Sequence, residues 1–187
     1  MNTWRLPTSL EIGGVGWNIR TDFRDILYAI SYFNNPNYEL DEAWEICLTV
    51  VIENYKNMPS SLKNEAVEKV MEFIDMGTND DDRPKPRVMD WEQDAPIIIP
   101  AINKVMGREV RSMEYCHWWT FMGAYMEIGE NSLFSNILNI RLKKAEGKKL
   151  EKHEQEFYRK NKSIVVIKEK YTEEELKEME RFKALFD

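Results

Sequence analysis

The chain has few residues of the types that usually carry covalent or metal chemistry. Its 187 residues include two cysteines and two histidines, with no CxxC pair and no HxxxH spacing. The recurring ligand patterns of zinc sites are therefore missing, and we expect neither a metal nor another cofactor. Both cysteines, Cys47 and Cys116, lie in strongly apolar contexts, so we expect them to be reduced and buried.

Long apolar runs are missing as well. No stretch approaches the ~18–20 apolar residues that a membrane span requires. Residues 1–14 lack the basic start and apolar stretch of a signal peptide. We therefore expect a protein without a membrane partner that stays in the cytoplasm of the cell that makes it.

Positive charge is scarce over most of the chain. The net charge is −7, but residues 1–140 hold 12 Lys/Arg and 22 Asp/Glu, whereas residues 141–187 hold 14 and 11. An acidic body repels phosphate backbones, so we expect no nucleic-acid partner. The basic stretch 141–162 could contact something acidic, but its interspersed glutamates favour a solvated helix face.

Apolar residues are plentiful enough for a core. They make up 43% of the chain, and aromatic residues make up 12%. A chain of this length buries roughly 70% of its unfolded surface without needing disulfides or metals. We predict a mainly α, compact multi-helix domain with an N-terminal β-hairpin and a C-terminal amphipathic helix. A helical core domain is expected over residues 1–147, followed by a charged extension over residues 148–187, because composition turns from apolar to basic near Gly147.

Residues 9–19, SLEIGGVGWNI, predict the hairpin. Gly13 and Gly14 can supply the positive φ angles of a two-residue turn, which would pair Ile12 with Val15 and Leu10 with Trp17. Further along the chain, apolar spacing and capping residues predict helices that begin after Thr21 or Asp22, near Asp41, after Pro59, near Asp94, after Ser112, after Ser132 and after Thr172.

Two segments are harder to assign. Pro96 and Pro100 each lack a backbone donor, so we expect the helix near Asp94 to hold Pro96 in its first turn and to kink at Pro100. The conformation of residues 91–100 is left open. Residues 163–171, SIVVIKEKY, are expected to be extended.

Two groups of residues suggest catalysis at first sight. Cys116 and His117 are adjacent, but neighbours on a helix point about 100° apart and do not form a dyad, and the other histidine, His153, lies in the charged tail. Asp90 and Asp94 have the spacing of paired carboxylates on one helix face, yet acids at a helix start are favoured by the exposed amides there. Both groups are interpreted as structural, and no catalytic residue is predicted.

The last helix is the best candidate for binding a partner. It is terminal and amphipathic, and Thr172 with Glu175 predicts a capping box at its start. Such a helix can lay its apolar side chains into the groove of another protein. The side chains predicted to bind are Leu176, Met179, Phe182 and Leu185.

Several stretches together resemble one family. They are LPTSLEIGGVGWNIRTDFRDIL near the start, DWEQDAPIIIPAI and HWWTFMGAYMEI in the middle, and then ILNIRLKK and EFYRKNK. In this order they are similar to the bacteriophage gp-fifteen family of tail-region proteins from tailed phages and prophages of Gram-positive bacteria. The resemblance covers roughly residues 6–162. The residues that carry it most specifically, or recur in its motifs, are Asp22, Arg24, Asp90, Trp91, Asp94, His117, Trp118 and Trp119.

The resemblance implies a phage or prophage protein in the cytoplasm of the bacterial host. Gene position in the family implies a non-enzymatic tail assembly chaperone that binds the tape measure protein or the major tail protein. Alternatives are a structural component of the virion tail and an uncharacterised hydrolase. A homo-oligomer is left open, as is a longer frameshifted product. The resemblance brings no catalytic residues, and Arg24 is expected to pair with one of the helix-start carboxylates.

Overall fold

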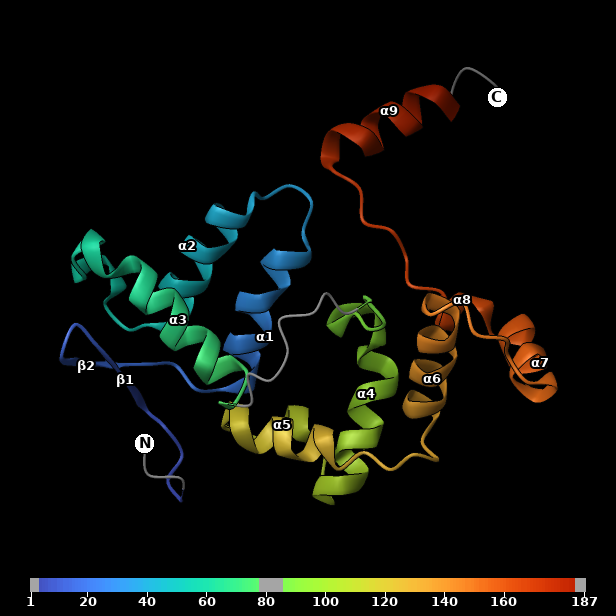
Figure 1. Cartoon of the computed structure of the whole chain (residues 1–187), viewed down its shortest axis with the longest axis horizontal. Coiled ribbons are helices and arrows are strands. Elements are labelled where there is room, and N and C mark those ends of the chain that lie inside the picture. The colour runs from blue at the N-terminus through green and yellow to red at the C-terminus, as the bar shows by residue number, and fades with distance from the viewer. Residues whose placement is uncertain (1–3, 78–85, 184–187) are drawn as a thin grey trace. The chain divides into compact units, whose positions relative to one another are not determined.

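The computed structural model describes residues 4–77 and 86–183 (Figure 1). The chain divides into two compact units, one formed by residues 1–79 with 169–187 and the other by residues 80–168. The mainly helical architecture with an N-terminal hairpin and a C-terminal helix is confirmed. Within the described ranges, no helix is long and apolar enough to cross a membrane. The expected boundary between residues 147 and 148 stays a prediction.

The N-terminal hairpin has the predicted register. Strand β1 (Ser9–Ile12) pairs antiparallel with β2 (Val15–Asn18), with Ile12 opposite Val15 and Leu10 opposite Trp17. Gly13 and Gly14 have φ angles of 60° and 73°, as the turn requires. A Cβ on Gly13 would lie 2.7 Å from Leu62 Cδ1, so the Leu62 side chain would have to shift to accept any other residue there.

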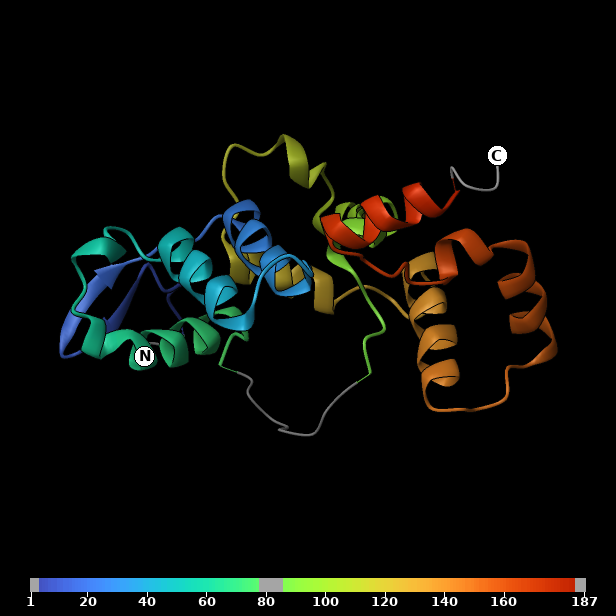
Figure 2. The ribbon, with the colours of Figure 1, turned by 90° about the horizontal axis from the view of Figure 1, so that it is seen from above.

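Three helices complete the core of this unit. They are α1 (Phe23–Ser31), α2 (Leu40–Val51) and α3 (Lys63–Ile74), and short 3-10 helices occupy Tyr32–Asn34, Tyr55–Asn57 and Ser60–Leu62. Helices α1 and α2 lie side by side, and α3 packs against both α2 and β1 (Figure 2). Their buried side chains form the core, among them Phe23, Ile26, Cys47, Leu48, Val70 and Phe73.

The named elements in the described part of the second unit are all helices. Its elements are α4 (Trp91–Met106), a 3-10 helix (Val110–Ser112), α5 (Trp118–Met126), α6 (Leu133–Ala145), α7 (Lys152–Lys160) and α8 (Lys162–Val165). Helix α4 contacts both α5 and α6. Helices α6 and α7 lie side by side, and α8 lies at the end opposite their connecting loop (Figure 2). Ile137, Ile140 and Val165 form a buried cluster there.

The expected start of α4 is wrong. The helix begins at Trp91 rather than near Asp94, so Pro96 lies in its interior and not in its first turn. The Asp90 carboxylate accepts hydrogen bonds from the amides of Glu92 and Gln93, which fixes the earlier start. Pro96 and Pro100 are four residues apart and lie on the same, outer side of the helix, so the two lost backbone bonds lie towards solvent. The kink at Pro100 stays a prediction.

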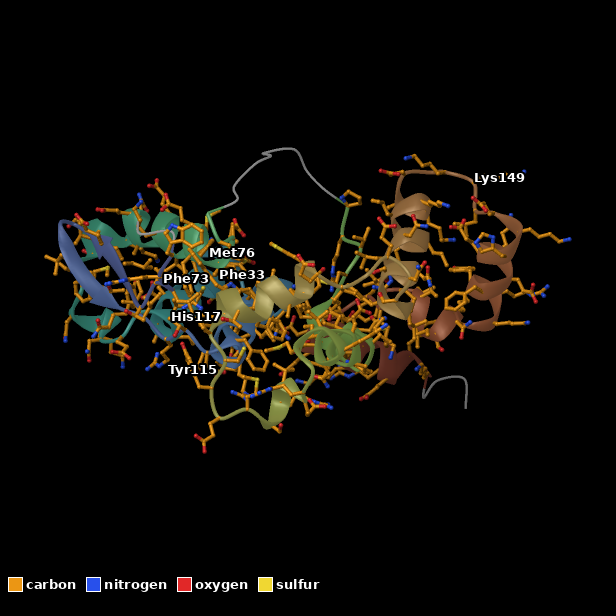
Figure 3. The ribbon with its side chains drawn as sticks, turned by 90° about the horizontal axis from the view of Figure 1, so that it is seen from below. Phe33, Phe73, Met76, Tyr115, His117 and Lys149 are labelled. Carbon is orange, nitrogen blue, oxygen red and sulfur yellow. The ribbon has the colours of Figure 1, made fainter. Side chains whose placement is uncertain are left out.

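The expected start of α5 is also wrong. Ser112 ends a 3-10 helix and its hydroxyl donates to the carbonyl of Glu109 at 2.7 Å, so it is not the cap of α5. The helix begins at Trp118, with His117 as its N-cap (Figure 3). Cys116 and His117 therefore precede the helix instead of lying within it, although both are buried.

The extended segment expected over residues 163–171 is partly wrong. Helix α8 includes residues 163–165, and only the remainder lacks regular structure. Beyond it, α9 (Glu173–Lys183) begins with the predicted capping box. The Thr172 hydroxyl accepts from the Glu175 amide, and the Glu175 carboxylate accepts from the Thr172 amide. The amide of Glu173 also donates to the Asn37 side chain at 3.0 Å.

Cys47 lies on α2 and is buried, which predicts that its thiol is unreactive. Cys47 has no exposed surface, and this burial raises the pKa of its thiol to about 12. Because the thiolate is the reactive form, a Cys116→Ala variant should show no fast reaction with a thiol reagent at about pH 8 in the native state. One equivalent should react after unfolding in guanidinium chloride. Fast reaction of the folded variant would contradict this placement.

Candidate functional site

The N-terminus of α4 is built around two carboxylates. Asp90 caps the helix, and its own amide donates to Asp94 Oδ2 at 2.9 Å. Arg87 forms an ion pair with Asp90. Both carboxyl groups are buried, with residue exposures of 3% and 1%. These carboxylates are therefore committed to backbone amides and cations.

Arg141 on α6 binds the second of these carboxylates from the opposite side. Its Nη1 lies 2.6 Å from Asp94 Oδ2 and its Nη2 lies 2.8 Å from Asp94 Oδ1, which is a bidentate pair. The guanidinium also donates to the carbonyls of Val88, Ile164 and Val165. The Arg141 side chain is only 5% exposed. We call Asp94, Arg141 and these three carbonyls the clamp.

The clamp holds a segment that we call the strap, residues 164–168. Two of its carbonyls accept from Arg141, and Gln93 on α4 extends the attachment. The side-chain amide of Gln93 makes both contacts. Its Nε2 donates to the carbonyl of Val166 and its Oε1 accepts from the backbone amide of Lys168, both at 2.8 Å. The strap is therefore fixed to α4 and α6 by polar contacts, while Val165 fills the core cluster.

Aromatic rings position α5 against α4. The ring of Trp91 lies 6.3 Å from that of Trp118 and 5.1 Å from that of Tyr125, centroid to centroid. Trp118 stacks on Phe121 at 5.9 Å and is 1% exposed. These distances are typical of favourable aromatic pairs. His117 completes the helix start, because its Nδ1 accepts from the Trp119 amide at 3.0 Å.

The motif residues predicted from the sequence fall into both units. Asp90, Trp91, Asp94, His117, Trp118 and Trp119 belong to residues 80–168, where they cap and pack α4 and α5. In the other unit, Asp22 caps α1 and forms an ion pair with Arg24 at 3.0 Å. The pairing of Arg24 with a helix-start carboxylate is thus confirmed.

Arg141 was missed by the sequence reasoning. A signal for it exists, because it lies four residues after Ile137 and so continues the buried stripe of α6. A charged residue on an apolar stripe needs a buried partner of opposite sign. The motif carboxylate Asp94 is that partner.

The terminal helix has an exposed apolar stripe. Leu176, Met179 and Phe182 are 47%, 36% and 64% exposed, and none of the described residues of α9 is buried. A hollow of about 500 Å³ runs along this helix and is lined by Tyr171, Glu175, Glu178, Met179, Phe182 and Lys183. Leu185, the fourth residue predicted to bind a partner, lies outside the described residues. Leu176, Met179 and Phe182 therefore place apolar surface beside glutamates on the same helix.

Metal-binding geometry is missing from the described ranges. No group of three or more His, Cys, Asp or Glu side chains in residues 4–77 and 86–183 could hold a metal ion. The residues weighed for catalysis have structural contacts instead. Asp90 caps α4 and Asp94 binds Arg141, while Cys116 Sγ lies 3.8 Å from the carbonyl of His117.

The clamp generates a prediction about stability. Removing one member leaves an uncompensated buried charge, so Arg141→Met and Asp94→Leu should each lower the free energy of unfolding by about 3–5 kcal/mol. The double variant replaces the pair with apolar groups and should be clearly more stable than either single variant. Urea unfolding followed by tryptophan fluorescence measures this. Arg111→Met, in an exposed pair with Glu109, should leave the midpoint nearly unchanged. Additive losses in the double variant would contradict a coupled pair.

The cap of α5 generates a second prediction. His117→Ala removes the acceptor for the Trp119 amide and should lower the free energy of unfolding by about 1 kcal/mol or more. His117→Asn keeps an acceptor at the cap and should recover most of that loss. Thermal unfolding of both variants measures how much stability each one loses. Equal destabilisation by Ala and Asn would show that capping is not the role of this side chain.

Comparison with known proteins agrees with these motifs. A family model described as Bacteriophage Gp15 protein matches residues 3–167. No curated protein and no solved structure gives a match. The matched range contains the hairpin, α1–α8 and the clamp residues, and it ends within the strap. Because the match covers most of the chain, the protein belongs to the Bacteriophage Gp15 family, which indicates a phage-related structural or morphogenesis role.

Proposed function

We propose that the protein is a non-enzymatic tail assembly chaperone that binds the tape measure protein or tail subunits through α9. The observation that carries this proposal is the stripe of Leu176, Met179 and Phe182, which stays exposed on a capped terminal helix. Exposed apolar side chains on a helix are typical of surfaces that bind a partner.

Charge supports the same role. Residues 1–140 have a net charge of −10, and glutamates flank the stripe on α9. A tape measure protein is long, helical and apolar, so a chaperone must cover its apolar surface while keeping the complex soluble. A high net charge on the chaperone provides that solubility.

Helix length also supports binding through α9. The helix has eleven residues in its described range and buries none of them. Isolated helices of fewer than about 12–15 residues are marginally stable in water. Contact with a client would bury the apolar stripe and stabilise the helix. The family match ends at residue 167, so α9 lies outside the matched range.

The test is capture of tail proteins by the tagged chain. The full chain, co-expressed with the tape measure and major tail proteins of the same phage or prophage, should retain one of them on affinity resin. A Met179→Ala/Phe182→Ala variant should bind at least about 10-fold more weakly, because each large apolar side chain contributes roughly 1.5–3 kcal/mol when fully buried. Titration by fluorescence anisotropy measures the difference.

A matched control separates the stripe from the rest of the helix. Lys177→Ala/Arg181→Ala changes two long side chains of α9 outside the stripe and should leave capture unchanged. Failure of the wild-type chain to retain any tail protein, although it is folded, would overturn the proposal. Presence of the protein in purified virions would favour a structural component of the tail instead.

A further inference from the structure

The strap carries an unusual surface on its outer side. A hollow of about 210 Å³ opens there, with Val165, Val166, Ile167 and the ring of Tyr158 as apolar lining. The remaining lining residues are Lys144 and two arginines, Arg87 and Arg141, which form ion pairs with Asp90 and Asp94. We call this hollow, with its apolar floor and basic rim, the basic hollow.

The positive charge of this region extends beyond the hollow. Residues 141–170 contain 11 Lys/Arg and five Asp/Glu, a net charge of +6 in a chain that is acidic elsewhere. Part of this charge lies on the loop between α6 and α7, where Lys149 points away from the helices (Figure 3). A cationic surface within an acidic protein favours partners that carry negative charge.

The clamp presents the hollow in a fixed form. The strap is held by Arg141 and Gln93, so Val165 points into the core with 1% exposure whereas Val166 is 39% exposed. Lys144 Nζ lies 4.2 Å from the centre of the Tyr158 ring, a cation–π contact at the rim. The contacts of Arg141, Gln93 and Lys144 therefore hold the apolar and cationic side chains of the hollow in defined positions.

Helix α9 has the complementary chemistry. Its described residues hold five Glu and three Lys/Arg, a net charge of −2, and three of the glutamates lie in its first turn. Glu175, Glu178 and Lys183 line the same hollow as Met179 and Phe182, so a net negative charge flanks apolar surface on one side of the helix. The basic hollow offers apolar surface beside the ammonium group of Lys144, within a segment whose net charge is positive. Pairing the two would bury apolar area and bring opposite charges together.

We propose that the basic hollow binds α9 of a second copy of this chain. The two surfaces differ, so each copy would offer one hollow and one helix. Two copies that exchange their α9 helices reciprocally form a two-fold dimer, whereas contacts made once per pair join copies into rings or open chains. A helix of eleven residues covers less than the roughly 1,000 Å² of a stable interface, so this self-association is weak and reversible.

Self-association would cover the stripe that binds a client. This competition rests on the proposed function, whereas the contact between copies does not. A client that binds α9 would then displace this helix from the hollow of the neighbouring copy. The self-associated copies would dissociate as clients bind. The failure of either idea can be seen separately, because self-association is measured in the purified protein without any tail protein.

The experiment is sedimentation equilibrium of the purified full chain over about 5–200 μM. The wild-type chain should associate reversibly, and about 0.5 M NaCl should weaken the association because the contact is partly ionic. Glu178→Lys and Lys144→Glu should each weaken it by about 5-fold, since each turns an attractive pair into a repulsive one. The double variant Glu178→Lys/Lys144→Glu restores opposite charges and should return to within about 2-fold of wild type.

The controls distinguish this contact from others. Glu180→Lys makes the same charge change on α9 at a residue that does not line the hollow of Met179 and Phe182, and it should have little effect. Phe182→Glu and Val166→Glu should each abolish self-association, but their mixture should form a 1:1 complex, because one chain keeps its hollow and the other keeps its helix. A monomer at all concentrations would overturn the proposal. So would loss of association with Glu178→Lys but not with Lys144→Glu, which would indicate pairing between two α9 helices.

Discussion

The arrangement of the second unit depends on the buried ion pair between Asp94 and Arg141. Burying either charge alone would be costly, and the structure offsets that cost with two short contacts between them and three backbone carbonyls around the guanidinium. The same pair joins the first turn of α4 to α6 and to the strap. The chain therefore leaves this unit from a fixed point, with α9 beginning at Glu173 five residues after the strap ends.

Much of the fold follows from local rules that the sequence displays. The Gly13–Gly14 turn fixes the hairpin register, and the apolar residues on both sides have matching parity, so that Ile12 lies opposite Val15 and Leu10 opposite Trp17. The capping box at Thr172 depends on residues three apart and is equally readable. Family membership could also be predicted, because its motifs are spread over most of the chain.

Other features depend on tertiary context and could not be predicted in the same way. Proline preferences placed the start of α4 near Asp94, but capping by Asp90 and the outward position of both prolines allow them inside the helix. Ser112 resembled a cap, yet the histidine at position 117 performs that role with a ring nitrogen. Of the candidate site, the α9 stripe was predicted, whereas Arg141 and the strap required knowledge of which distant segments meet.

The central claim is that α9 is the surface that binds tail proteins, and hydrogen–deuterium exchange tests it most directly. Backbone amides of residues 173–183 should exchange quickly in the isolated chain, because a short helix with no buried residues opens easily. In the complex with the tape measure protein, the account predicts strong slowing of exchange over these residues. Unchanged exchange in α9, with slowing confined to other segments, would contradict it.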